Sequence, residues 1–231
     1  MDVAVVLTAA GSGSRLGRDL PKALVPLGDR ALVAHAAAAL VAAVPTGRLA
    51  VLVVTAPAGS EAQVSAAVGE ATAEAPVVVV TGRATRQGSV AAGLEVLGAY
   101  PEVTRVLVHD AARPRVPAAV VDRVLAALGA GHRAVVPGIP VTDTVKRVGT
   151  TPGAEGAEPV IETVPRGLLR AVQTPQGFDR SLLEQAHAAA AELAADEALA
   201  ASDDAGLVER LGEQVWVVAG DERAAQITTV G

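Results

Sequence analysis

The chain has 231 residues, of which 51% are hydrophobic, yet it contains only one Phe, one Trp and one Tyr. Ala and Val supply 50 and 38 of the hydrophobic residues, so the core must consist of small and branched side chains that let helices approach a sheet closely. This composition excludes a disordered chain and an RNA reader built on aromatic stacking. The formal net charge of −6 argues against binding to nucleic acid or to an anionic membrane.

The sequence contains no cysteine, which excludes a disulfide framework, a thiolate nucleophile and a zinc site with Cys ligands. The longest helix-like apolar stretch, residues 31–44, is shorter than the roughly 18 residues that a membrane-spanning helix needs. The first residues lead directly into an apolar run, unlike a secretory signal. We therefore expect a cytoplasmic protein without a membrane segment.

Short β-branched runs alternate with Ala-rich stretches from the start of the chain. This alternation is typical of a mostly parallel, doubly wound α/β sheet with crossover helices, in which strands are apolar on both faces. The predicted order is strand 3–7, helix 31–44, strand 49–54, helix 60–73, strand 77–80, helix 87–98, strand 103–108, helix 118–129 and strand 134–136.

The regular alternation stops at residues 141–164, where two β-branched runs flank a turn rich in Gly, Pro and Glu. This pattern predicts an antiparallel hairpin that projects from the sheet, as a lid or a dimer arm does. Beyond it we expect helices over 181–195 and 203–211 and a last strand over 214–219. The chain is thus predicted to be one domain, 1–231, with a hairpin arm at about 141–166.

A glycine-rich loop follows the first strand directly and reads Ala9-Ala10-Gly11-Ser12-Gly13-Ser14-Arg15-Leu16-Gly17. It lies at the edge of the sheet where carboxyl ends of parallel strands gather ligands, and its glycines let backbone N–H groups approach phosphate oxygens. A dinucleotide fingerprint would need glycine at Leu16, and no Walker loop occurs. An ordinary strand-to-helix turn explains the glycines but not the nearby cations Arg15 and Lys22.

Lys22 is one of only two lysines in a chain with 17 arginines, and it follows Pro21 just after this loop. A compact ammonium group suits a phosphate on which negative charge develops. A solvated surface charge is the alternative.

Five motifs occur in order along the chain: Leu7 to Leu16 with Pro21-Lys22, His109-Asp110-Ala111-Ala112-Arg113-Pro114, Pro140 to Lys146, Thr174-Pro175-Gln176 and Ser202-Asp203-Asp204. The first resembles the signature of sugar-phosphate nucleotidyltransferases, and the ordered set resembles the 2-C-methyl-D-erythritol 4-phosphate cytidylyltransferase family of non-mevalonate isoprenoid synthesis. The resemblance covers nearly the whole chain. It implies a Rossmann-like fold and transfer of CMP from CTP to methylerythritol phosphate with release of pyrophosphate.

The resemblance also implies roles for individual residues. Arg15 and Lys22 would stabilise the transition state together with Mg²⁺, whose protein ligands stay open. The expected nucleotide-binding residues are Ala9, Ala10, Gly11, Ser12, Gly13, Ser14, Arg86, Ser89 and Asp110. The expected substrate-binding residues are Asp110, Arg113, Thr144, Arg166 and Gln226. Thr144 and Arg166 would reach the site of the neighbouring subunit in a homodimer formed through the arm.

Structural alternatives stay open for these residues. Asp110 and Arg113 could be a capping pair, Ser89 an ordinary helix residue, and the arm a solvated hairpin. Two positions depart from the family pattern: Ala84 stands where many members carry an acidic residue, and Gln226 where members carry a lysine. The histidines show no metal-binding spacing, so His35, His132 and His187 are expected to fill surface or core.

Three other functions compete with this one. A pentitol-phosphate cytidylyltransferase, for example one acting on ribitol 5-phosphate, shares the loop and the Asp110–Arg113 type of motif. A dinucleotide-binding oxidoreductase is disfavoured by Leu16. A non-catalytic nucleotide-binding relative would be favoured by two features. These are Gln226, and the end of the chain at Gly231, where family members continue into another helix. Because aromatic residues are scarce, a cytosine would have to be selected by backbone groups near residues 9–11 and 86–89.

Overall fold

The central feature is an eight-stranded mixed sheet in the order β10-β7-β11-β6-β1-β4-β5, with β12 paired to β7. The computed structural model of the chain describes residues 1–11, 21–72, 75–149, 156–193 and 201–227. The strands of the sheet are β1 (Val3–Thr8), β4 (Leu49–Ala56), β5 (Val77–Thr81), β6 (Arg105–Asp110), β7 (Ala134–Pro140), β10 (Arg170–Val172), β11 (Gln176–Asp179) and β12 (Trp216–Ala219).

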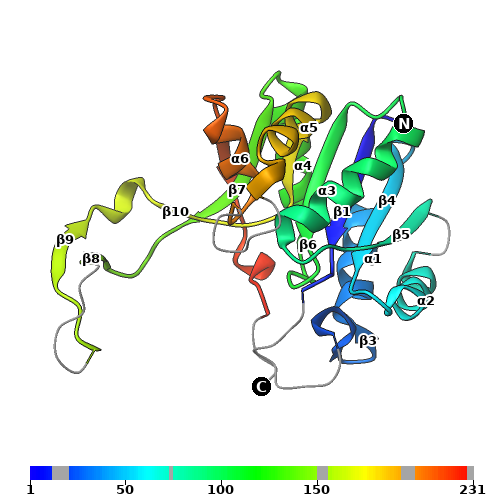
Figure 1. Cartoon of the computed structure of the whole chain (residues 1–231), viewed down its shortest axis with the longest axis horizontal. Helices are drawn as coiled ribbons and strands as arrows, with labels where there is room; N and C mark the ends of the chain where they lie inside the picture. The colour runs from blue at the N-terminus through cyan, green and yellow to red at the C-terminus, as the bar shows by residue number, and fades with distance from the viewer. Residues whose placement is uncertain (12–20, 73–74, 150–155, 194–200, 228–231) are drawn as a thin grey trace.

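Helices cover both faces of this sheet (Figure 1). They are α1 (Leu32–Ala43), α2 (Glu61–Ala71), α3 (Arg86–Val96), α4 (Ala118–Gly129), α5 (Arg180–Ala189) and α6 (Asp204–Arg210). Alternate residues of β1 point to opposite faces, because side chains of a strand alternate. Val5 packs in the core with α1, α2 and α4, whereas Val6 packs in the core with α3, α5 and α6. The predicted doubly wound α/β architecture is therefore confirmed.

The direction in which successive parallel strands are added to the sheet reverses at β1. From β1 the chain adds β4 and then β5 on one side, and it then returns to place β6 on the other side of β1. In open α/β sheets a ligand binds outside the carboxyl ends of the strands at such a switch point. The ends of β1 and β6, where Thr8 pairs in register with Asp110, are therefore the expected place for a site.

The predicted hairpin is present as β8 (Val145–Val148) paired antiparallel with β9 (Val160–Val164). It stands away from the sheet at the end of a long excursion that leaves through β7 and returns through β10 (Figure 1). A second small hairpin, β2 (Pro26–Leu27) with β3 (Arg30–Ala31), lies before α1.

Four strands and several boundaries differ from the sequence-based prediction. The prediction lacks the strands β2, β3, β10 and β11, because runs of two to four residues show no apolar alternation. β11 nevertheless pairs antiparallel with both β6 and β7. β1 continues to Thr8, β6 includes Asp110, and the helix expected over 181–195 ends at Ala189, before the 3-10 turn Ala191–Leu193. No helix within the described ranges is long and apolar enough to cross a membrane.

The small residues of the helices allow the close packing that the composition predicts. A Cβ atom added to Gly93 of α3 would lie 2.6 Å from Val6 Cγ1 on β1, a distance that real Cβ atoms do not reach. Gly69 of α2 has nothing within 4 Å of the corresponding position. The first glycine is therefore required for helix–sheet contact, and the second is not.

We predict opposite effects for the two Gly-to-Ala substitutions. Gly69→Ala should raise the free energy of unfolding by up to about 1 kcal/mol, because Ala favours the helix over Gly. Gly93→Ala gains the same preference but overpacks the core, and should lower the free energy of unfolding by roughly 1–3 kcal/mol. Urea denaturation of both variants measures the two changes, and equal shifts would contradict the packing argument.

Candidate active site

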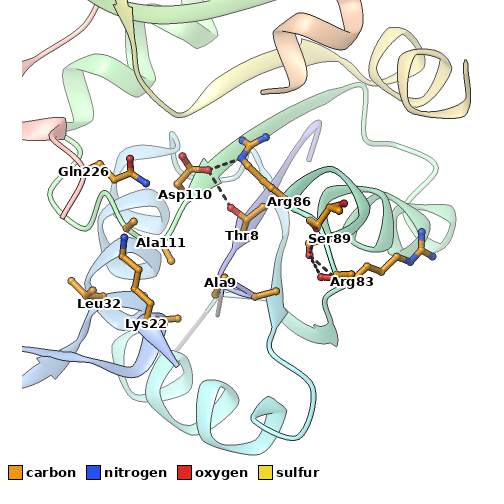
Figure 2. A pocket seen from close by; sticks show the side chains of 16 residues that line it. Thr8, Ala9, Lys22, Leu32, Arg83, Arg86, Ser89, Asp110, Ala111 and Gln226 are labelled. Atoms are coloured by element: carbon orange, nitrogen blue, oxygen red, sulfur yellow. Dashed lines mark hydrogen bonds and ion pairs between the residues drawn. The ribbon is translucent and has the colours of Figure 1, made fainter. Parts of the chain in front are cut away.

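A cavity of about 710 Å³ opens at the carboxyl ends of β1 and β6. This volume lies within the usual range for small-molecule sites. Its walls come from the end of β1 and the following loop, the 3-10 turn that begins at Lys22, the segment leading into α3, the end of β6, and the C-terminal segment at Gln226. Figure 2 shows Lys22 extending toward the side of the cavity where Asp110 and Gln226 lie.

Asp110 is the acidic residue among the described lining residues. Its Oδ1 accepts a hydrogen bond of 3.2 Å from the Thr8 hydroxyl and one of 3.0 Å from Arg86 Nε (Figure 2). The register of β1 with β6 places Thr8 beside Asp110, and α3 brings Arg86 to them. The carboxylate is therefore held in one orientation from two sides.

The ionised state of Asp110 follows from its neighbours. Burial by itself raises the pKa of this carboxyl, but Arg86, His109 and Arg113 together lower that pKa below its ordinary value. Asp110 is therefore a carboxylate that accepts hydrogen bonds and can approach hydroxyls or a cation.

Close packing of two loops shapes the floor of the cavity. A Cβ atom on Gly82, directly after β5, would lie 2.2 Å from Ala10 Cβ and 2.9 Å from Ser89 Oγ. Glycine at this position therefore lets the segment before α3 lie against the loop after β1. Thr85 caps α3 by accepting a hydrogen bond from the Gly88 N–H, which fixes the start of that helix.

The loop after β6 is organised by buried His109. The Asp110 N–H donates to Thr174 Oγ1 at 3.2 Å, and Thr174 Oγ1 lies 3.0 Å from His109 Nδ1. His109 Nε2 lies 3.0 Å from the Arg113 carbonyl oxygen, which can only accept. This carbonyl requires a proton on Nε2. Burial lowers the pKa of the imidazole to about 4, so the ring is neutral at pH 7.

The structure brings together many of the residues that the sequence selects. The predicted residues that line the cavity are residues 9–11, Lys22, Arg86, Ser89, Asp110 and Gln226. Ser89 is buried, and its hydroxyl bonds to the backbone of Arg83 and Thr85, so it also holds the segment before α3 in place. Ser12, Gly13, Ser14 and Arg15 lie outside the described residues.

Three predicted residues are not among the lining residues of this cavity. Arg113 Nη1 donates to the Ala224 carbonyl at 2.8 Å, so this guanidinium ties the loop after β6 to the C-terminal segment. Thr144 lies exposed in the arm, and Arg166 follows β9 and donates to the Thr142 carbonyl. The contribution of these arm residues to a neighbouring subunit stays a prediction.

Sequence reasoning missed the contacts behind the cavity. The sequence predicts no individual role for Thr8, although this residue ends the first strand beside Asp110. It indicates Asp204 only as part of a motif and predicts that His187 fills surface or core, yet Asp204 bonds to both Arg86 and His187. Their sequence separation hides this contact, because Arg86 and Asp204 are 118 positions apart.

The fold and the cavity place the chain among α/β proteins with a ligand site at the switch point of a Rossmann-like sheet. A sequence model of the 2-C-methyl-D-erythritol 4-phosphate cytidylyltransferase family matches residues 3–231. The chain belongs to this family of nucleotidyltransferase enzymes.

Individual relatives agree with this assignment. The chain is 44% identical over 230 residues to the enzyme of that name from Streptomyces coelicolor, covering 97% of this chain and 80% of the relative. It is 46% identical over 227 residues to the one from Nocardia farcinica, covering 98% and 89%. The crystal structure of the Thermus thermophilus enzyme superposes with a TM-score of 0.72 at 37% identity, covering 98% of this chain and 93% of that one.

We predict that burial of neutral His109 makes the fold sensitive to mild acid. The unfolded chain takes up a proton near the ordinary histidine pKa of 6.5, whereas the folded chain does so only near 4. The free energy of unfolding should therefore fall as the pH drops from 6.5 to 4, by up to roughly 3.5 kcal/mol, since one pKa unit corresponds to about 1.4 kcal/mol. Denaturant unfolding at several pH values measures this slope.

The His109→Gln variant is the control, because glutamine does not titrate. It should unfold more easily at pH 7 and show a shallower pH dependence between 6.5 and 4. The same slope in the wild type and the variant would remove His109 as the cause.

Proposed function

We propose that this protein transfers CMP from CTP to 2-C-methyl-D-erythritol 4-phosphate. A phosphate oxygen of the acceptor attacks the α-phosphorus of CTP and forms the new P–O bond. The bond from the α-phosphorus to the oxygen bridging to the β-phosphorus breaks, and pyrophosphate leaves. The product is the cytidine diphosphate derivative of methylerythritol, an intermediate of non-mevalonate isoprenoid synthesis. Membership of the family and a cavity at the switch point support this reaction together.

The observation that carries the proposal is the meeting of three chemical features in one cavity. Backbone groups of residues 9–11 lie at the end of β1, the Lys22 ammonium comes from the following 3-10 turn, and the Asp110 carboxylate comes from β6. Phosphoryl transfer asks a protein mainly to position its reactants in line and to neutralise developing charge. We assign Lys22, with Arg15, to charge neutralisation and the loop N–H groups to the triphosphate.

The cytosine is read without an aromatic platform. No Phe, Tyr or Trp is among the described residues that line the cavity, and Phe178 is fully buried in the core. The lining includes small side chains at Ala9, Ala10 and Ala84, which leave room for a base. We therefore assign recognition of the cytosine edge to backbone groups of residues 9–11 and of the segment that leads into α3.

The cavity fits a magnesium ion bound mainly through the substrate. Mg²⁺ commonly binds one or two carboxylates together with substrate phosphates, and keeps several waters. Within the described ranges no cluster of three acidic or His side chains forms a metal site without substrate, but the Asp110 carboxylate lines the cavity and is ionised. Asp110 is thus the described residue that would contact Mg²⁺. When bound, the ion neutralises phosphate charge.

We further propose that the protein is a single domain that acts as a homodimer through its arm, about residues 141–166. Strand β9 of the hairpin exposes apolar side chains: Val160 and Ile161 are 58% and 64% exposed. Leu168, in the 3-10 turn that follows, is 90% exposed. A two-stranded hairpin alone is at best marginally stable in water, so a partner surface would stabilise it. Thr144 and Arg166 would then be delivered to the partner's acceptor site, and Arg166 could grip a phosphate bidentately.

We predict that Lys22→Ala folds normally but transfers CMP at least 10²–10³ times more slowly, the usual cost of removing one preorganised group that stabilises the transition state. The measurement is pyrophosphate release from CTP, Mg²⁺ and methylerythritol phosphate, with circular dichroism to check the fold. Arg210→Ala, which removes an exposed cation at the end of α6, is the control and should match the wild type. Near-normal turnover of Lys22→Ala would exclude this residue from the mechanism.

The same assay separates the competing functions. Faster release with ribitol 5-phosphate than with methylerythritol phosphate would reassign the acceptor. Tight CTP binding without pyrophosphate release from either acceptor would identify a non-catalytic relative.

We predict that Ile161→Asp weakens the dimer, because it places a charge on the apolar arm surface. Sedimentation velocity should show the wild type as a dimer, and the variant should dissociate at concentrations where the wild type does not. The transfer rate should fall with dissociation, since each acceptor site lacks the partner's Arg166. Glu162→Gln changes the next residue of β9 and is the control. A fully active wild-type monomer would rule out the shared site.

A further inference from the structure

A line of buried polar side chains runs from α5 and α6 to the wall of the cavity. His187 Nε2 donates to Asp204 Oδ1 at 2.9 Å, and Arg86 Nη1 donates to Asp204 Oδ2 at 2.7 Å. Arg86 Nε in turn donates to Asp110 Oδ1 at 3.0 Å. One guanidinium therefore joins a carboxylate in the cavity to a carboxylate behind it.

Asp204 itself is out of reach of a ligand. It is 1% exposed and does not line the cavity, whereas Arg86 and Asp110 do. Both of its carboxylate oxygens already accept charge-assisted or imidazole hydrogen bonds. Burial raises the pKa of this carboxyl, but Arg86 and His187 lower it to about 2, so it is ionised at neutral pH.

The position of Asp204 is set by the start of α6. Asp203 caps this helix by accepting from the Gly206 N–H at 3.0 Å. Gln176 of β11 donates to Asp203 at 2.8 Å and accepts from the Ala205 N–H at 3.2 Å. The backbone N–H that follows Asp204 and the side chain that precedes it are thus both bound to Gln176, on a central strand of the sheet. Asp204 is a fixed acceptor to which a flexible arginine can be anchored.

Resting on the transfer reaction proposed above, we propose that Asp204, backed by His187, is a positioning residue. It fixes the Arg86 guanidinium, and through Arg86 it fixes the orientation of the Asp110 carboxylate in the cavity. An arginine has several rotatable bonds, and a single hydrogen bond to Asp110 would leave its guanidinium free to pivot. Bonds to two carboxylates remove this freedom. Two nitrogens of Arg86, Nε and Nη1, thus hold the two carboxylates, and Asp110 is presented to the substrate in a fixed orientation.

Matched variants separate positioning from stability. In Asp204→Asn the charge behind Arg86 is removed, and kcat/KM should fall roughly 10- to 100-fold, as for loss of outer partners of site residues elsewhere. Glu209→Gln removes a charge from the exposed side of the same helix, and its kcat/KM should stay within about twofold of wild type. Thermal melts of both identify the folded enzyme. A folded Asp204→Asn with wild-type kcat/KM would overturn the proposal.

His187 provides a second, milder pair of variants in case Asp204→Asn does not fold. His187→Leu removes the donor to Asp204 and should lower kcat/KM several-fold. His187→Gln keeps an N–H donor at a similar distance from the backbone and should restore most of the lost rate. Equal rates for the two variants would contradict a role for His187 behind Asp204.

A double-mutant cycle tests the route through Asp110. If Asp204 acts by orienting Asp110, the Asp110→Asn/Asp204→Asn double variant should be no slower than Asp110→Asn alone. Two results would overturn this route. One is a kcat/KM of the double variant that falls by the product of the two single losses, and the other is a wild-type kcat/KM for Asp110→Asn alone.

An NMR measurement separates this proposal from the proposed function. In protein labelled with ¹⁵N-arginine, the Arg86 Nε–H should give a resonance protected from exchange with water, which Arg86→Lys assigns. Loss of protection in Asp204→Asn supports positioning, and equal protection in both proteins overturns it. Wild-type protein that forms no product from CTP and methylerythritol phosphate would instead disprove the proposed function, whatever the NMR shows.

Discussion

Central strand β1 is the constraint on which the rest of the structure depends. Its residues Val3 to Leu7 are fully buried, with alternate side chains packed in cores on opposite faces of the sheet. A strand buried on both faces cannot slip by one residue without exchanging its two cores. Its register with β6 is therefore fixed, and this register sets Thr8 beside Asp110. The loop that leaves β1 consequently begins at the switch point of the sheet.

Small residues allow the close packing that shapes the cavity beside this pair of strands. Gly93 lets α3 lie directly on β1, and Gly82 lets the segment before α3 lie against Ala10. Because α3 sits so close, Arg86 at its start reaches the carboxylate of Asp110. The Ala-rich, aromatic-poor composition thus has a consequence for chemistry as well as for packing. The cavity is lined by backbone and short side chains, with a few charged groups at defined points.

The charged residues around the cavity come from two separate parts of the fold. Asp110, Arg86, Asp204 and His187 form one connected group in which the buried charges have opposite partners, the condition under which buried charge is tolerated. Lys22 comes from a different element, the 3-10 turn after Pro21. The acidic side of the cavity is therefore held from behind by α5 and α6, whereas the basic side belongs to the segment that follows the glycine-rich loop.

The sequence alone determined the alternating α/β architecture, the projecting hairpin, the family, and the cavity residues Lys22, Arg86, Asp110 and Gln226. These follow from periodicity within short segments and from motifs in order, both of which are local signals. The place of β11 between β6 and β7 follows from the folded chain, since its four residues carry no alternation and are held by pairing with both neighbours. Folding likewise brings Arg113 to backbone carbonyls away from the cavity lining, and Asp204 and His187 behind Arg86. Arg86 with Asp204, and Arg113 with Ala224, are more than a hundred positions apart in the chain. Such hydrogen bonds form only when the sheet brings distant segments together, and a local sequence pattern cannot predict them.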